Sequence, residues 1–451
     1  MRSSALKYAI LSAVGSAVLI ILALMPFHAF LTVWLSSSLG HYTALRLWKE
    51  VILVLCGLGV ACLLMMDAKI RAHTLFRRLI WLIVSYLGFL LLYAIGSLQS
   101  GSVEHKATAY GTLLDSRFLL FFLITWAIAL RTNRLEQQWQ KIILIPAAIV
   151  IVFGLAQALI LPHDFLVHFG YGPDTIKAFD TVNQNSMFVR IQSTLRGSNP
   201  LGAYLVIPIA VVTTLLLRCG FSWRKAGFLA ASLLALYFTY SRSAYLGAIL
   251  AILVVAVIAV RSKLGRRYVY GALAGLAVLA GLLGILVQHN GRVQNVLLHT
   301  SDSSTAVMSS NQGRAAGIEQ GVIDLETDPL GDGPGSAGPA SFYNAPNNPR
   351  IAENYFLQIG QEIGIPGLIA FITINVGIGY LLWIRRDNNL ALALLASLIG
   401  LSFINLLSHA WADDTLAYVW WGLAGIAMAQ LPAVEVIKTK VVRGKKAKQS
   451  A

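Results

Sequence analysis

Two arginines beside an apolar run are the first residues in this sequence that could do chemistry. Arg190 and Arg196 bracket the segment Ile191-Gln-Ser-Thr-Leu195, and Gly197-Ser-Asn-Pro200 follows just before an apolar run. Asn199-Pro200 is typical of a helix start, so two guanidinium groups and a helix N-terminus are predicted to lie together. Guanidinium forks match phosphate oxygens, and a helix N-terminus adds partial positive charge. The segment therefore predicts an anion site that includes Asn199; the alternative is an arginine anchored at a membrane surface.

Two further arginines could extend this site. Arg242 lies in Tyr240-Ser-Arg-Ser243, a very short connection between two apolar runs. Most other bases of the chain lie on the opposite set of connections, so this position favours anion binding over anchoring. Arg314 lies in a segment with an amphipathic helical pattern. It is either a fourth ligand for the anion or part of a solvated face.

Carboxylates begin the long apolar run that follows. In Glu353-Asn354-Tyr355, the carboxylate either complements the helix dipole and caps the helix or is a general base that deprotonates a hydroxyl group. We assign Glu353, Arg190 and Arg242 to catalysis and Asn354 to substrate binding. Glu362 lies two helical turns deeper and needs a partner there, for which Arg242 or Arg190 is a candidate.

A polar corner separates the last two apolar runs. It contains His409, Asp413 and Asp414, which either cap helices or support the site, and His409 is a second candidate base and a substrate ligand. The sequence has no Walker loop, no dinucleotide glycine fingerprint and no His/Cys spacing typical of a metal site. We therefore expect no cofactor and no metal, and a chemistry that depends on arginines and a carboxylate.

The composition is that of an integral membrane protein: 57% of the 451 residues are hydrophobic, 12% are charged, and the mean hydropathy is +0.69. Apolar runs that approach the roughly 20 residues needed to cross a bilayer recur along the chain, and they are solid rather than alternating, which predicts helices. We predict an all-α polytopic fold with about twelve transmembrane helices, at residues 8–28, 50–66, 79–97, 117–130, 142–161, 199–217, 226–240, 244–260, 269–288, 353–384, 389–408 and 415–431.

The bases are distributed unequally over the connections. One alternating set of connections, together with both termini, carries 24 of the 35 Lys and Arg residues and four of the 20 acids. This asymmetry places both termini in the cytoplasm. The net charge of +15 is spread over many short loops rather than one face, so we expect membrane lipid and no nucleic acid as a partner. The three cysteines are scattered and imply no disulfide framework.

Two connections on the opposite, outer side are long. Residues 161–200 carry aromatic and apolar residues, so part of this loop is expected along the membrane interface. The loop at 289–352, between the ninth and tenth spans, contains a predicted amphipathic helix at 311–327 with Ala315, Ile318, Val322 and Leu325 on one face. Residues 329–339 are too rich in Gly and Pro for a helix. We expect this loop to be an ordered lid.

These segments resemble the O-antigen ligase and Wzy-type polymerase family over residues 161–431. The likeness lies in Arg190-Ile-Gln-Ser-Thr-Leu-Arg-Gly-Ser-Asn-Pro-Leu-Gly-Ala-Tyr204 and in Tyr240-Ser-Arg-Ser-Ala-Tyr-Leu-Gly247. It continues in Gly313-Arg314, in Asp328-Pro-Leu-Gly-Asp-Gly-Pro-Gly335 and in Glu353-Asn-Tyr-Phe-Leu357. The ligases of the family carry a His-Asn pair where this chain has Glu353-Asn354.

The resemblance implies a multi-pass glycosyltransferase of the bacterial inner membrane. Such enzymes move a glycan from a polyprenyl-diphosphate carrier to a glycan or lipid acceptor at the extracytoplasmic face, without metal or nucleotide. The family's pyrophosphate-binding arginines correspond to Arg190, Arg242, Arg196 and Arg314. The chain then divides into spans at 1–160, a ligase- or polymerase-like core at 161–431, and a basic cytoplasmic tail at 432–451.

Two other functions remain open from the sequence. The first is a secondary transporter of anions or other solutes, which would place ionisable groups near mid-bilayer and show paired broken spans. The second is a non-catalytic protein that handles lipid-linked glycans. Ligase, polymerase, the sugar, the stereochemistry, the oligomeric state and the choice of Glu353 or a histidine as base also stay open.

Overall fold

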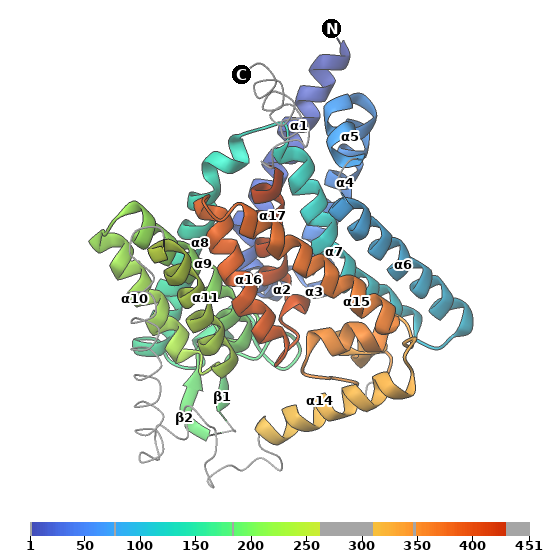
Figure 1. Ribbon diagram of the computed structural model, residues 1–451. Coiled ribbons are helices and arrows are strands. Elements are labelled where there is room, and N and C mark those ends of the chain that lie inside the picture. Colours follow the sequence, from blue (N-terminus) through green and yellow to red (C-terminus); the bar gives the residue numbers. More distant parts are fainter. Residues whose placement is uncertain (1, 76–77, 183–184, 262–309, 346–348, 430–451) are drawn as a thin grey trace.

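The computed structural model describes residues 2–75, 78–182, 185–261, 310–345 and 349–429 (Figure 1). The predicted span 269–288, part of the loop at 289–352 and the basic tail at 432–451 lie outside these residues.

Helices make up most of the described chain. The elements before the first strand are α1 (Arg2–Leu24), the 3-10 helix η1 (Met25–Phe27), α2 (His28–Leu39), α3 (Tyr42–Arg46), α4 (Trp48–Met66), α5 (Ala68–Leu75), α6 (Arg78–Ser100), α7 (His105–Ala129), α8 (Arg134–Leu159) and η2 (Phe165–Phe169). The remaining elements are β1 (Asp180–Val182), β2 (Asn185–Arg190), α9 (Ser198–Cys219), α10 (Trp223–Phe238), α11 (Arg242–Arg261), α14 (Ser310–Thr327), η3 (Gly338–Tyr343), α15 (Tyr355–Ile384), α16 (Asn389–Asn405), η4 (Ala410–Ala412) and α17 (Asp414–Ala429).

The helices agree with the predicted spans in the described ranges. Eight helical stretches there are long and apolar enough to cross a membrane, and they coincide with eight predicted spans. Three other predicted spans, at 226–240, 389–408 and 415–431, coincide with α10, α16 and α17, which have 16, 17 and 16 residues. A helix satisfies its own backbone hydrogen bonds, as a chain surrounded by lipid must. The protein is therefore a mostly helical, multi-pass membrane protein.

The first span is longer than predicted and is interrupted at Pro26. α1 and α2 form one apolar stretch, Ala5–Leu39, with the 3-10 turn η1 between them. In this turn the carbonyl oxygens of Met25 and Pro26 accept hydrogen bonds from the hydroxyls of Thr415 and Thr194, at 2.8 and 2.7 Å. These bonds satisfy backbone oxygens at the interruption, and they join it to α17 and to the loop before α9.

α7 begins at His105, well before the predicted span 117–130. Asp115 and Arg117 therefore lie in a helix interior and are 0% and 1% exposed. Two charged residues therefore lie inside this helix. Its charged residues are tolerated because they meet polar partners from other helices, as described below.

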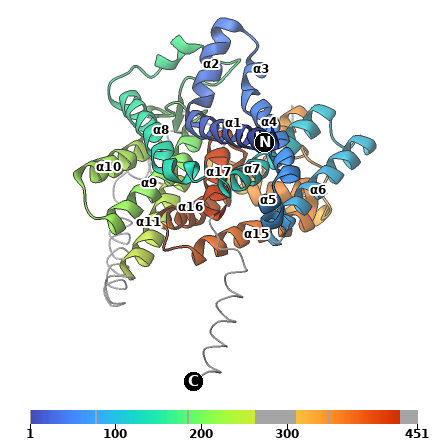
Figure 2. The same cartoon turned by 90° about the horizontal axis from the view of Figure 1, so that it is seen from above.

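The helices pack around α17, whose residues are all buried and which lies at the centre of the bundle when viewed along it (Figure 2). α5 and the start of α1 lie at one end of the molecule, and α14 and the two strands lie at the other (Figure 1). At the α5 end, Asp67 forms ion pairs with Lys7 (2.7 Å) and Arg131 (2.6 Å). Three of the predicted base-rich connections therefore meet at one corner.

The loop at 161–200 contains an antiparallel hairpin that the sequence did not indicate. Strand β1 pairs with β2, with Asp180 opposite Arg190. The strands have three and six residues, and the pairing is irregular between Thr181 and Val182. Strands this short show no clear alternation of apolar and polar residues, so the sequence did not predict the hairpin.

Helix α14 confirms the predicted helix at 311–327, but only part of the predicted face packs against the protein. Ile318 and Leu325 are half-buried, whereas Ala315 is exposed. Val322 is 41% exposed, whereas Gly321 is buried. A Cβ atom on Gly317 would lie 2.8 Å from the carbonyl oxygen of Ile351, and one on Gly321 would lie 3.0 Å from the Cβ of Ala352. Two glycines of the helix therefore lie against the chain before α15. Glycine has no side chain, so a pattern of apolar side chains does not reveal this contact.

The Gly- and Pro-rich segment 329–339 packs against a break in α15. Ile363 and Gly364 leave the helical conformation there, and Pro366 follows. The freed carbonyl oxygens of Gln361 and Glu362 accept hydrogen bonds from the backbone N–H groups of Asp332 (3.0 Å) and Gly333 (2.9 Å). The loop thus supplies the donors that the broken helix lacks, as a backbone in a membrane requires.

Candidate functional site

Arg190 is held by three different parts of the chain. It ends strand β2, and its Nε atom donates to the carbonyl oxygen of Thr239 at the end of α10 (2.9 Å). Its Nη2 atom donates a hydrogen bond to Asn199 Oδ1 (2.5 Å), and its Nη1 atom lies 3.5 Å from Asp180 Oδ2. The side chain is 12% exposed. Burial and the nearby Arg314 lower the pKa of Arg190, whereas Asp180 opposes this shift.

Arg190, Arg242 and Arg314 form one cationic group. Arg242 is the first residue of α11, after a turn in which Tyr240 has a φ of 49°. It interacts electrostatically with both Arg314 and Arg190. These three arginines come from a hairpin, a transmembrane helix and the amphipathic helix α14. Three like charges kept close together in a partly buried place favour an anion between them.

The start of α15 directs Glu353 away from the helix. Asn354 is the capping residue, because its Oδ1 atom accepts hydrogen bonds from the N–H groups of Phe356 (2.9 Å) and Leu357 (3.1 Å). Glu353 precedes the cap with a φ of 51°, a left-handed conformation that is unfavourable for glutamate. Its carboxylate lies 3.7 Å from Arg314 Nε. The capping role proposed for Glu353 thus belongs to Asn354, whose role in substrate binding stays a prediction.

Four predicted residues line one cavity of about 270 Å³. They are Arg196, Asn199, Glu353 and His409. They come from the loop before α9, the start of α9, the residue before the cap of α15 and the loop after α16. Ser243 of α11, Ser408 and Asp413 complete the polar part of the wall. Arg190 lines a neighbouring cavity of about 170 Å³ with Phe179 and Phe238.

His409 is neutral at physiological pH in this site. Burial, together with the positive charges of Arg196 and Arg314, lowers its pKa to about 4. A neutral imidazole has one nitrogen that can accept a proton. The cavity therefore contains two groups able to act as a base, His409 and Glu353.

Arg196 joins this cavity to a buried ion network. Its Nε atom pairs with Asp413 Oδ2 at 2.7 Å, and the other carboxylate oxygen of Asp413 accepts the N–H of Leu416 (3.1 Å) in the first turn of α17. Asp413 thus caps a helix and holds a site arginine at once. Helix capping is thus confirmed for Asp413, and its support of the site stays a prediction.

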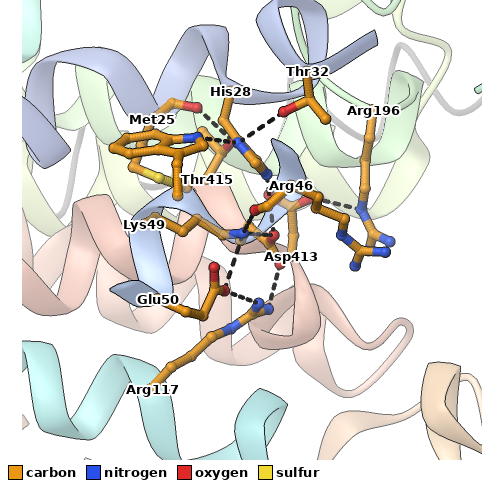
Figure 3. Close-up of polar contacts among 12 residues, drawn as sticks. Met25, His28, Thr32, Arg46, Lys49, Glu50, Arg117, Arg196, Asp413 and Thr415 are labelled. Carbon is orange, nitrogen blue, oxygen red and sulfur yellow. Dashed lines mark hydrogen bonds and ion pairs between the residues drawn. The ribbon is translucent and has the colours of Figure 1, made fainter. Parts of the chain in front are cut away.

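The next residue, Asp414, binds a charged cluster from the N-terminal helices. Figure 3 shows His28, Lys49, Glu50 and Arg117 of this cluster. Its carboxylate pairs with Arg117 of α7, with Lys49 of α4 (2.9 Å) and with His28 Nε2 (3.4 Å). Glu50 pairs with Lys49 (3.0 Å) and Arg117 (3.5 Å). Two cations and two carboxylates therefore balance one another in the interior. Lys49 and Arg117 are each 1% exposed.

The sequence pattern did not predict this ion network. Its available signal was Lys49-Glu50 at the start of one span and Asp115 with Arg117 at the start of another. Charged pairs at predicted span boundaries normally lie in the interfacial region, so they attracted no functional interpretation.

Glu362 has partners other than the two arginines considered for it. Its Oε1 atom accepts the backbone N–H of Gly335 at 2.9 Å. Its carboxyl group also lies near that of Asp115, whose Oδ1 atom accepts a hydrogen bond from the hydroxyl of Tyr355 at 2.9 Å. Glu362 therefore ties the loop 329–339 to α7 and α15 and lies outside the arginine group.

Within the described ranges, no three His, Cys, Asp or Glu side chains are arranged to hold a metal ion. The fold and the site together define a multi-pass helical membrane protein with an arginine- and carboxylate-lined cavity near one end of its bundle. Residues 227–372 match the family model of the O-antigen ligase domain, so the resemblance to the O-antigen ligase and Wzy family is confirmed there. The matched region contains Arg242, Arg314, Glu353 and Asn354. No curated protein matches the chain.

Proposed function

We propose that this protein transfers or polymerises a glycan from a polyprenyl-diphosphate carrier onto an acceptor hydroxyl group. The reaction takes place at the extracytoplasmic face of the bacterial inner membrane, with both termini in the cytoplasm and α14 forming part of a lid over the site. The carrier's tail stays in the bilayer, and its diphosphate binds Arg190, Arg242 and Arg314.

One observation carries this proposal. A single cavity is lined by Arg196, Asn199, Glu353 and His409, and the Arg190, Arg242 and Arg314 group lies beside it, linked through the ion pair of Arg314 with Glu353. An anionic leaving group and a base are the two requirements of glycan transfer from a diphosphate. The match of residues 227–372 to the O-antigen ligase domain supports the same class of reaction.

The chemical step follows from these roles. The acceptor oxygen bonds to the anomeric carbon of the glycan as the bond from that carbon to the diphosphate oxygen breaks. Glu353 takes the hydroxyl proton. The arginines stabilise the charge that develops on the departing diphosphate. His409 is the alternative base, because it is neutral and lines the same cavity.

The reaction is proposed to need no metal ion, since the guanidinium groups carry the positive charge that a metal would supply. Transfer measured after exhaustive EDTA treatment is expected to equal the untreated rate. Restoration by added Mg²⁺ or Mn²⁺ of activity lost in EDTA would show that this part of the proposal is wrong.

The proposal is tested by replacing the arginines in the full-length protein. We expect Arg190→Ala and Arg242→Ala to abolish surface glycan in cells while the variant proteins remain folded in the membrane. Arg224→Ala is the matched control, because Arg224 is an exposed arginine at the start of α10. Normal glycan in both site variants would exclude the proposed function.

The same cells distinguish the two reaction types. In a strain that lacks the protein, single repeat units on the acceptor indicate a polymerase. Long chains that remain on the carrier lipid indicate a ligase.

A secondary transporter is a second candidate, favoured by the ionisable residues inside helices. Asp115, Arg117 and Glu362 are buried in α7 and α15, and α15 is broken at Gly364. These three side chains already have partners within the protein, so glycan transfer is the better-supported function. Solute flux in proteoliposomes that contain no lipid-linked sugar would favour the transporter.

A further inference from the structure

A second, larger cavity adjoins the proposed reaction site. It measures about 420 Å³, within the range of roughly 300–1,000 Å³ common for small-molecule sites. Its walls come from α2, α3, the loop before β1, the segment before α9 and the start of α17. Arg196, Gly197 and Asp413 line both this cavity and the one that contains Glu353. The two cavities therefore meet at the ion pair of Arg196 with Asp413.

The carboxylates in this wall already have cationic partners. Asp413 pairs with Arg196 at 2.7 Å, and Asp180 lies 3.5 Å from Arg190. Asp414 pairs with Lys49 and Arg117 of the buried network. Of the three, Asp414 also interacts electrostatically with Arg46.

Two cations of the same wall have no such partner. Among the described residues, no carboxylate lies within ion-pair distance of Arg46 or Lys177. Arg46 of α3 donates instead to the hydroxyl of Tyr110 and lies over its ring, 5.2 Å from the ring centroid. Arg46 and Lys177 therefore carry positive charge in this wall outside the ion pairs of Arg196 and of the buried network.

The wall also contains a hydroxyl group without a hydrogen-bond partner. Ser198 is 3% exposed, and its Oγ atom has no partner among the described residues. Thr32, Tyr42 and Thr175 add further hydroxyl groups to the same wall. Hydroxyl groups together with unpaired cations are suited to a sugar that carries an anionic substituent.

We propose that this cavity binds a sugar residue bearing a carboxylate or a phosphate, with Arg46 and Lys177 as its anion ligands. The inference rests on the proposed function, since the sugar belongs to one of the two glycans that meet at Glu353. The diphosphate is bound elsewhere, by the Arg190, Arg242 and Arg314 group.

Binding of defined oligosaccharides to the purified full-length protein in nanodiscs tests the site directly. Trigalacturonate is the anionic probe and maltotriose is the neutral one. We expect trigalacturonate to bind at least about tenfold more tightly, and Lys177→Ala to remove most of that difference. Lys177 is exposed in the loop before β1, so its loss leaves the fold intact, and Lys177→Arg is expected to retain binding. Equal affinity for the two probes, or unchanged trigalacturonate affinity in Lys177→Ala, would overturn the proposal.

A second measurement separates this proposal from the proposed function. Farnesyl diphosphate binding should weaken in Arg190→Ala and stay unchanged in Lys177→Ala, whereas trigalacturonate binding should show the opposite pattern. If trigalacturonate binding depends on Lys177 but surface glycan is normal in both Arg190→Ala and Arg242→Ala, the sugar site stands and the transferase assignment fails. Trigalacturonate binding that is lost in Arg190→Ala and kept in Lys177→Ala contradicts the sugar site.

Kinetics identify which glycan supplies the anionic sugar. In a transfer assay, Lys177→Ala should raise the KM of the acceptor if the acceptor carries the anion, or the KM of the donor if the donor glycan does. Either result supports the site. Unchanged KM values for both substrates contradict it.

Discussion

Arg314 Nε and Glu353 Oε2 lie 3.7 Å apart, and this ion pair joins α14 to the start of α15. Their side chains are 21% and 32% exposed, so both remain accessible to a substrate. A diphosphate that binds Arg314 would draw this cation away from Glu353. This ion pair therefore joins a proposed diphosphate ligand directly to the proposed base.

Replacing the carboxylate by an amide tests Glu353 as the base. We expect Glu353→Gln to lower kcat by roughly 100- to 10,000-fold, the usual contribution of general base catalysis, with little change in KM. The measurement is single-turnover glycan transfer by the purified variant. Glu319→Gln, an exposed position on α14, is the control and should retain wild-type activity. Normal turnover in Glu353→Gln with loss of activity in His409→Gln would assign the base to His409.

The low pKa of His409 predicts a change of stability with pH. In the unfolded chain its pKa is expected near the ordinary value of 6.5, whereas in the folded protein it is about 4. Between these values the unfolded state binds more protons, so the free energy of unfolding falls as pH decreases from about 6.5 to about 4. Thermal unfolding followed by tryptophan fluorescence should show this loss. His409→Gln should reduce it, and an identical pH profile in the variant would contradict the assignment.

Much of the membrane fold was predictable from sequence, because the span signal is a local one. A run such as 199–217 must be helical in lipid whatever its neighbours are, and α9 occupies Ser198–Cys219. The hairpin β1–β2 and the break of α15 depend on pairing between segments. Local composition does not determine such pairing. The buried face of α14 was predicted only in part for the same reason, since the close contacts of Gly317 and Gly321 depend on Ile351 and Ala352.

The candidate site was predictable to the extent that its residues stand out by type. Arginines beside spans are costly, so Arg190, Arg196 and Arg242 were conspicuous. Arg46 and Lys177 were not, because a base in a predicted connection has an ordinary explanation. Their relation to the cavity depends on α3 and the loop before β1 meeting the start of α17, a contact between parts of the chain far apart in sequence.

The buried ion network should respond very differently to single and double substitutions. Arg117→Met leaves Asp414 and Glu50 with one cation fewer, and breaking a buried pair in this way costs about 3–5 kcal/mol. The double variant Arg117→Met/Asp414→Leu removes one charge of each sign, so its loss should be smaller than the sum of the two single losses. Denaturant unfolding in bicelles measures the free energy of unfolding of each variant. Arg134→Ala, an exposed position on α8, should change it by less than about 0.5 kcal/mol. Additive losses in the double variant would mean that the two residues act independently.

The docking of the loop 329–339 depends on the absence of a side chain at Gly335. Its φ is 89°, and a Cβ atom there would lie 2.2 Å from the carbonyl oxygen of Ala107. Gly335→Ala should therefore push the loop away from α7 and break the hydrogen bond from Gly335 N–H to Glu362. Since the same loop precedes Glu353, we expect both a lower melting temperature and a large loss of transfer activity. Limited proteolysis of the outer loops should also become faster.

Gly172→Ala is the matched control for this loop variant. Gly172 also lies in a connection outside the helices, but a Cβ atom there would have no heavy atom within 4 Å. Its substitution should leave the melting temperature and the activity unchanged. If Gly335→Ala behaves like Gly172→Ala, the loop does not depend on close contact with α7. The hydrogen bonds from Asp332 and Gly333 to the break in α15 would then not account for the position of Glu353.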